Sequence, residues 1–229
     1  MDLYPAILTR HSVHQFGADP LDPAILEEIL EAVRSARGIG GQSIEAELAT
    51  GSQVKGSSAP HHLLAFTAQD DVGFANAGYV LQEADLALQT QGLGSHWIGL
   101  AKPKAKRPDF TIALAFGPTD EPPRQPEAFN RLDLSAISDQ DNCVARAVRL
   151  APSGINDQPW RLEFDEGLVR LIHTRRGPFS LVLAKKVDKI SLGIATRHAV
   201  VALAHEGHEV SSVVAADHSG SFCLEVSYH

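Results

Sequence analysis

The sequence repeats itself at an offset of 115 positions, about half of its 229 residues. AVRSA at residues 32–36 lies over AVRLA at 147–151, and GYVLQEADLALQTQG from Gly78 lies over GIATRHAVVALAHEG from Gly193. One offset found twice suggests an ancient duplication, and therefore two halves of similar fold. Chance matching of helices rich in alanine and leucine is the alternative.

The predicted elements agree with two similar halves. A helix start is indicated by Asp22 followed by Pro23, because aspartate caps helices and proline suits the first helical position. In the first half we expect helices over residues 3–9, 22–36 and 74–91, and strands over 62–67 and 110–116. In the second half we expect helices over 139–150 and 190–206, and strands over 160–164, 168–173, 210–214 and 222–226.

The two long helices are apolar on nearly all sides. Residues 74–91 leave only a thin polar stripe, which is typical of a helix buried on most of its surface. If each half contributes one such helix, the two pack together at the centre. We therefore expect a first half over 1–117, a proline-rich connector over 118–132 and a second half over 133–229, joined in one globular unit.

Composition argues against several classes of function. The formal net charge is -8, which disfavours binding to nucleic acid or to an anionic membrane. No stretch approaches the roughly 20 apolar residues that span a bilayer, and the N-terminal residues do not resemble a signal peptide. Cys143 and Cys223 are isolated, which suits a reducing compartment. We expect a cytoplasmic protein.

A first candidate site is RHSVH at residues 10–14, directly after a short predicted helix. Arg10 offers a forked donor to an anion, and Ser12 adds a hydroxyl. The alternative is that Ser12 caps a turn and Arg10 is a solvated surface charge, and the segment alone favours this alternative.

A second candidate is APSGINDQPW at residues 151–160, between a helix and a strand. Its prolines and Gly154 restrict the path of the loop, leaving Ser153 and Asn156 free to face a ligand. An amide both donates and accepts hydrogen bonds, which suits the mixed edge of a flavin ring. An ordinary connecting loop is the alternative.

Two further segments complete the candidates. GLGSHWIG at residues 92–99 has glycines that allow a ligand to approach the backbone closely, and Trp97 with Ile98 begins an extended run. Arg124 in the connector is a candidate phosphate ligand or a solvated charge.

Other chemistries lack their minimum parts. The sequence contains no GxGxxG, GxSxG, HExxH or GxxxxGK[ST] motif, so it does not support a Rossmann nucleotide site, a serine hydrolase, a zinc protease or an NTPase. His205 and His208 have a spacing that suits a metal, but no carboxylate-rich segment accompanies them. We expect no metal site.

Taken together, the motifs resemble the nitroreductase family. ILTRHSVHQF at residues 7–16 is similar to the family's Arg-x-Ser segment, APSGINDQPW to its Pro-Ser-x-x-Asn loop, and GLGSHWIG to its Gly-Leu-Gly segment. The resemblance implies an α+β fold in which each half has a mainly antiparallel sheet flanked by helices. It also implies FMN, contacted by Arg10, His11, Ser12, His14, Trp97, Ile98, Gly99, Arg124, Pro152, Ser153, Gly154 and Asn156.

The order of the motifs departs from ordinary family members, which are homodimers with FMN between subunits. Here the Arg-x-Ser motif is in the first half and the loop is in the second. ARGIGGQS at residues 36–43, where the first half's own loop would stand, lacks the Pro-Ser and the Asn. This resembles the fused branch of the family, in which one chain imitates the dimer. We therefore expect one FMN per chain and a monomer.

The resemblance implies a flavin-dependent reductase in which NADH or NADPH and then a small-molecule acceptor react in ping-pong order. His14 stands where the family often has lysine or arginine, which puts the flavin potential in question. A flavin-binding protein for storage or sensing is one alternative. A scaffold that has lost FMN is another.

Overall fold

The computed structural model describes residues 2–174 and 181–229 and contains two four-stranded antiparallel sheets. The first has the order β1 (Glu45–Thr50), β3 (His61–Phe66), β6 (Phe110–Pro118), β4 (Leu93–Ile98). The second has the order β7 (Trp160–Asp165), β8 (Leu168–His173), β10 (Ser221–Tyr228), β9 (Val210–His218). Both sheets therefore connect their strands in the same order, first, second, fourth, third. A small third sheet pairs β2 (Val54–Lys55) with β5 (Lys102–Pro103).

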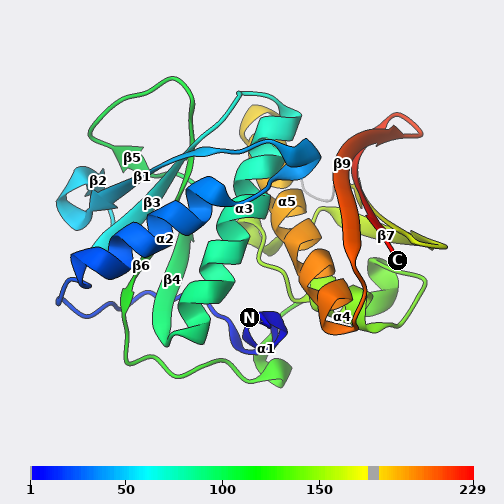
Figure 1. Cartoon of the computed structure of the whole chain (residues 1–229), viewed down its shortest axis with the longest axis horizontal. Helices are drawn as coiled ribbons and strands as arrows, with labels where there is room; N and C mark the ends of the chain where they lie inside the picture. Colours follow the sequence, from blue (N-terminus) through cyan, green and yellow to red (C-terminus); the bar gives the residue numbers. More distant parts are fainter. Residues whose placement is uncertain (1, 175–180) are drawn as a thin grey trace.

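Five α-helices accompany the sheets: α1 (Tyr4–Thr9), α2 (Pro23–Ser35), α3 (Asp71–Thr90), α4 (Cys143–Arg149) and α5 (Leu181–His205). Helices α3 and α5 pack side by side at the centre, with one sheet to either side (Figure 1). Helix α2 lies against β1 and α4 lies against α5. The apolar character of both long helices follows from this position, because each is covered by a sheet and by the other helix.

One hydrophobic core runs through both halves. A single cluster of buried apolar side chains extends from Ala6 in α1 to Val226 in β10. The predicted α+β fold with two antiparallel sheets is thus confirmed. The boundaries at residues 117 and 132 remain a prediction, since the shared core does not divide there.

The repeat offset recurs in hydrogen bonds. The N–H of Ile39 donates to the side chain of Asn76 at 2.8 Å, and the N–H of Gly154 donates to Ser191 Oγ at 3.1 Å. The donors and the acceptors are each 115 positions apart. Each half therefore attaches a tight 3₁₀ turn to its long helix in the same way.

Two helices differ in length from the sequence-based expectation. Helix α4 begins at Cys143 rather than 139, because the Asn142 side chain accepts a hydrogen bond from the N–H of Ala145 at 2.8 Å and so caps the helix. Helix α5 begins at Leu181, nine residues before the predicted start.

Strand β1 was not predicted, because its buried residues Ala46 and Ala49 are three positions apart and so do not alternate, and because Glu45 and Glu47 interrupt the apolar pattern. It is the edge of the first sheet and pairs only with β3. The extended run expected to begin near Trp97 instead ends there, since β4 spans Leu93–Ile98.

Candidate functional site

Arg10 is buried at the end of α1, with 1% of its surface exposed. Its backbone N–H donates to the carbonyl of Ala6 at 2.8 Å, which closes the last turn of the helix. Its Nε lies 3.0 Å from Oδ2 of Asp85. Its Nη2 has no hydrogen-bond partner within the described residues. Arg10 therefore carries a spare donor at a fixed position.

Asp85 is fully buried on α3 and holds Arg10 through a polar network. Oδ2 accepts from Gln82 Nε2 at 3.0 Å, and Oδ1 accepts from the hydroxyl of Ser95 and from Gln89 Nε2 at 3.3 Å. A buried charge is stable only when it is paired and hydrogen bonded. Asp85 was not among the predicted site residues, although an acidic side chain within a largely apolar helix is a usable signal.

Gln89 ties the same network to the RHS segment. Its Oε1 accepts from the N–H of His11, and its Nε2 donates to the carbonyl of His11, both at 3.2 Å. Ser12 forms a parallel bridge with Ser95, and the N–H of Val13 donates to the Ser95 carbonyl at 2.9 Å. The segment thus runs beside β4, which explains how the two motifs come together.

Two more arginines approach Arg10 from the connector. Their guanidinium carbons lie over the ring of Phe129, Arg124 at 5.0 Å and Arg131 at 5.6 Å from its centre. Burial, then Arg10, lowers the pKa of Arg124. Burial, and after it Arg10 and Arg124, lowers the pKa of Arg131 to about 10. Three buried or half-buried cations therefore repel one another here, and Arg131 was not among the predicted residues.

The loop after α4 is shaped by two left-handed residues. Ile155 and Asn156 have φ values of 51° and 61°, and the corresponding positions 115 residues earlier are Gly40 and Gly41, with φ values of 63° and 73°. The same turn therefore occurs in both halves, and in the second half its two left-handed positions are occupied by residues other than glycine. The left-handed backbone conformation is strained for a β-branched residue such as Ile155. The Ile155 side chain is 71% exposed.

Gly154 in this loop lies against α5. A Cβ on Gly154 would fall 2.0 Å from Cγ1 of Val187, so only glycine fits without displacing that side chain. The hydroxyl of Ser153 accepts a hydrogen bond from the N–H of Gln158 at 2.9 Å. Pro152 and Ser153 remain partly exposed.

Asn156 does not point freely outward as expected. Its Oδ1 accepts from Arg131 Nη1 at 2.8 Å, and its Nδ2 donates to the carbonyl of Asn130 at 2.9 Å. Both ends of the amide are engaged by the end of the connector. The physical reason is that residues 130–131 cross beside the loop, which no local pattern reveals. In this structure Asn156 positions Arg131.

His11 and His14 share an acidic neighbour. Glu121 Oε1 accepts from the N–H of His14 at 3.0 Å, and Glu121 Oε2 lies 3.5 Å from Nε2 of His11. The His14 ring lies 4.4 Å from the ring of His96 on β4. Burial, then His14 and Arg10, lowers the pKa of His96. Burial likewise lowers the pKa of His11 against the opposing effect of Glu121.

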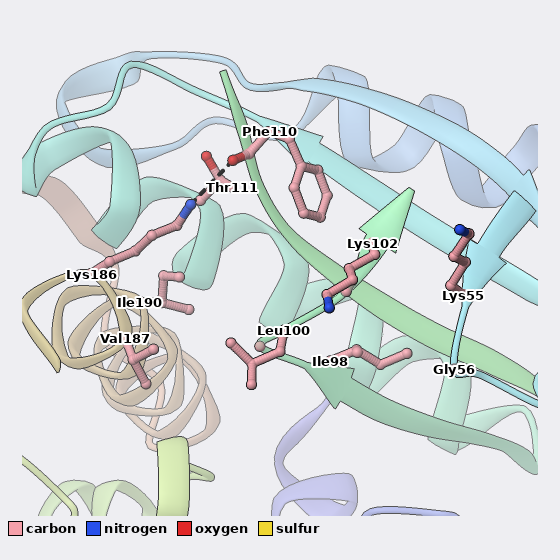
Figure 2. A pocket seen from close by; sticks show the side chains of 12 residues that line it. Lys55, Gly56, Ile98, Leu100, Lys102, Phe110, Thr111, Lys186, Val187 and Ile190 are labelled. Carbon is pink, nitrogen blue, oxygen red and sulfur yellow. Dashed lines mark hydrogen bonds between the residues drawn. The ribbon is translucent and has the colours of Figure 1, made fainter. Parts of the chain in front are cut away.

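Ile98 and Gly99, at the end of β4, line a cavity of about 840 Å³ (Figure 2). Its opposite wall is α5, from which Val187 and Ile190 point inward. Trp97 is half-buried beside it, and its Nε1 has no partner within the described chain. Since Val187 also touches the Gly154 position, the cavity adjoins the loop.

Two residues that were not predicted connect the candidate segments. Arg131 joins the arginines to Asn156, and Val187 joins Gly154 to the cavity at Gly99. The described residues contain no group of three or more His, Cys, Asp or Glu placed to hold a metal ion. No helix in the described part of the chain is long and apolar enough to cross a membrane.

Comparison with known proteins identifies the family. A family model described as "Putative TM nitroreductase" matches residues 2–203. A crystal structure from Thermotoga maritima, likewise described as a nitroreductase, superposes with a TM-score of 0.71 at 20% identity, covering 98% of this chain and 93% of that one. This likeness shows the fold. No curated protein matches the sequence.

Two shorter structures are similar to part of the chain. A nitroreductase in complex with FMN from Desulfovibrio desulfuricans has a TM-score of 0.47 at 18% identity, covering 61% of this chain and 96% of that one. A nitroreductase with bound FMN from Desulfitobacterium hafniense has a TM-score of 0.43 at 15% identity, covering 58% of this chain and 99% of that one.

Proposed function

The chain belongs to the TM nitroreductase family, and from this we propose that it binds one FMN and works as an FMN-dependent oxidoreductase. NADH or NADPH would supply the electrons, and a small molecule such as a nitroaromatic or a quinone would accept them. The observation that carries the proposal is the surplus of positive charge at Arg10, Arg124 and Arg131, of which Asp85 balances one.

The arginines fit the phosphate of FMN. Burying cations without counter-ions is unfavourable, and a phosphate dianion is the ligand that guanidinium groups bind best. Arg10 offers its unpartnered Nη2, and Arg124 lies close enough to it for the two charges to interact. We expect these two to contact the phosphate, with Ser12 and His11 beside them. Arg131 adds charge and holds the loop.

The ring of FMN would lie at the cavity. Gly154 of the loop adjoins the cavity through Val187, while Ile98 and Gly99 form the edge provided by β4. We expect Pro152 and Ser153 to contact the ring from the same loop. When bound, FMN supplies hydride transfer, so no side chain needs to act as a nucleophile. One cavity beside the ring would serve donor and acceptor in turn, which corresponds to ping-pong order.

His14 would stand at the pyrimidine side of the ring. Glu121 fixes its backbone N–H, and the His96 ring packs beside its own. A protonated imidazole would stabilise negative charge that develops on that side, and a neutral one would do so less.

A second, symmetry-related site would lack these groups. The positions 115 residues after Arg10 and Asp85 are Gln125 and Val200, which offer neither the cation nor its buried partner. In addition, β9 packs against the Ile39–Gly41 turn, which is the counterpart of the Gly154–Asn156 turn. We therefore propose one FMN per chain and, because α3 and α5 already pack as an internal dimer, a monomer.

The test is an absorbance titration of the purified protein with FMN, followed by anaerobic NADH or NADPH. We expect flavin bands near 370 and 450 nm that saturate at one FMN per chain and bleach with nucleotide. FMN that binds but is not reduced would favour a storage or sensing protein. Failure to bind FMN would overturn the proposal and leave a scaffold.

A further inference from the structure

The lysines of this acidic chain gather around the proposed ring site. The sequence has seven, Lys55, Lys102, Lys104, Lys106, Lys185, Lys186 and Lys189, against a formal net charge of -8. Lys55, Lys102 and Lys186 line the cavity at Gly99. Lys104 and Lys106 line an adjoining cavity of about 800 Å³, which shares Lys55, Lys102 and Phe110 with the first. Five of the seven lysines therefore border one continuous hollow.

Two of these lysines face each other across a strand pair. Lys55 on β2 is the direct antiparallel partner of Lys102 on β5 (Figure 2). Like charges placed directly opposite each other destabilise a sheet. A two-stranded ribbon with so few residues has little else to offset that repulsion. An anion between the two side chains would turn the repulsion into attraction.

In the described part of the chain, no salt bridge joins Lys55, Lys102, Lys104, Lys106 or Lys186 to an acidic side chain. Within residues 2–174 and 181–229, the salt bridges of the basic segment 102–107 belong to Arg107, which pairs with Glu45, Glu47 and Asp109. On the opposite wall, Lys186 donates to the carbonyl of Phe110 at 3.1 Å (Figure 2). Burial lowers the pKa of Lys186. Four charged lysines are thus left for a ligand.

The floor of the hollow is apolar, in contrast to its charged rim. Next to Gly99, the cavity is lined by Ile98, Val187 and Ile190, and the Leu100 side chain at its mouth is 70% exposed. A ligand that fills the hollow therefore needs a flat apolar end near β4 and several negative charges farther along β5. A nicotinamide dinucleotide has this shape, with its ring at one end and its phosphates beyond.

We infer that the five lysines lining the hollow, here called the lysine rim, bind the phosphates of the electron donor and make NADPH the preferred donor over NADH. This inference rests on the proposed function, because it places the flavin ring at the Gly99 end of the hollow, where the nicotinamide ring would stack on it. NADPH carries a 2′-phosphate that NADH lacks, so a rim of uncompensated lysines distinguishes the two by charge. Lys104 and Lys106, which line the second cavity but not the one at Gly99, bind the 2′-phosphate.

The first test measures binding without turnover. FMN-loaded protein is titrated calorimetrically with 2′,5′-ADP, which carries the 2′-phosphate, and with 5′-AMP, which does not. In the double variant Lys104→Ala/Lys106→Ala, we expect the Kd of 2′,5′-ADP to rise about tenfold at low ionic strength and that of 5′-AMP by less than about threefold, since an exposed ion pair contributes at most about 1 kcal/mol.

Lys185→Ala is the matched control, because Lys185 is exposed and lines neither cavity. It removes one positive charge from the chain and should change either Kd by less than about twofold. If Lys185→Ala weakened 2′,5′-ADP binding as much as the double variant does, the effect would come from the net charge of the protein and not from the lysine rim. That result would overturn the inference.

The second test separates donor from acceptor by following the bleaching of bound FMN at 450 nm. The double variant should slow reduction by NADPH at limiting concentration and leave reduction by NADH nearly unchanged. If it instead affects only reoxidation by an anionic quinone sulfonate, the rim binds the acceptor and the inference is wrong. If FMN binds but neither nucleotide reduces it in the wild type, the proposed function has failed, which is a different result.

Discussion

Gly78 and Gly193, 115 positions apart in the sequence, occupy matching places where α3 crosses α5. A Cβ on Gly78 would lie 2.0 Å from the carbonyl oxygen of Ile190, and one on Gly193 would lie 1.8 Å from that of Ala75. Ala75 and Ile190 are themselves 115 positions apart. The two helices therefore cross in a near-symmetric way, backbone against backbone, and the repeat offset is visible in their contacts.

This crossing predicts that Gly78→Ala lowers stability. Alanine is the better helix former by about 1 kcal/mol, but here its methyl group collides with a main-chain oxygen that cannot move alone. We expect a net loss of about 2 kcal/mol or more in the free energy of unfolding by urea. Gly99→Ala, with no atom within 4 Å of the new Cβ, should change it by less than about 0.5 kcal/mol. If Gly78→Ala were as stable as the wild type, α3 and α5 would have to lie farther apart than in this structure.

The buried ion pair predicts a large effect of Asp85→Asn. The change leaves the Arg10 guanidinium buried without its counter-charge, which typically costs about 3 to 5 kcal/mol. Urea unfolding of the FMN-free protein measures this loss in the free energy of unfolding. Asp141→Asn breaks the exposed pair with Arg146 and should cost under about 1 kcal/mol. Similar small losses in both variants would contradict a structural role for Asp85.

FMN should stabilise Asp85→Asn more than it stabilises the wild type. With Asp85 neutralised, the phosphate becomes the main counter-charge of Arg10, so part of the lost stability returns on binding. The measurement is the rise in melting temperature on adding saturating FMN to each protein. An equal rise in both would place the phosphate away from Arg10.

Arg124→Met should weaken FMN but not riboflavin. A charge-assisted hydrogen bond contributes about 1.5 to 3 kcal/mol, so we expect the Kd of FMN to rise by roughly tenfold to a hundredfold. Riboflavin has no phosphate, and its Kd should change little. Arg34→Met, an exposed arginine on α2, serves as the control. Equal weakening of both flavins would mean that Arg124 supports the ring rather than the phosphate.

Acid should destabilise the fold through two buried histidines. Burial lowers the pKa of His62 to about 4 and that of His198 to about 3. Both histidines bind protons more readily when the chain is unfolded. Their contribution to the free energy of unfolding is therefore complete above pH 6.5 and decreases as the pH falls toward 4 for His62 and 3 for His198. His62 alone corresponds to roughly 3 kcal/mol. Urea unfolding between pH 7.5 and 4.5 checks this.

His62→Gln should flatten that dependence on pH, since glutamine retains a polar group beside Ser57 but does not titrate. The control is His205→Gln, at an exposed residue paired with Asp2, which should leave the slope near that of the wild type. An unchanged slope in His62→Gln would mean that the pKa of His62 is the same in the folded and unfolded states.

The chain should be a monomer in solution. Helices α3 and α5 of one chain pack against each other, and we propose that this contact takes the place of a subunit interface. Light scattering coupled to gel filtration should give a mass near 24.6 kDa. A mass of twice that value, independent of dilution, would contradict the prediction.

Much of the fold could be predicted because the signals are local. The apolar pattern of residues 74–91 predicts α3, and Asp22 with Pro23 predicts the start of α2, as the structure confirms. The edge strand β1 was missed because its glutamates interrupt the pattern. The α+β class and the family were both recognisable from motifs of a few residues.

The sequence by itself determined the family, the two-sheet fold and the motifs that the site would use, because each depends on neighbouring residues. Only the tertiary structure decided which charges meet. Asp85 reaches Arg10 from 75 positions away, Arg131 takes the amide of Asn156, and the lysines of β2, β5 and α5 surround one hollow. These contacts depend on how helices and sheets pack, and a one-dimensional pattern does not record the distance between two buried side chains.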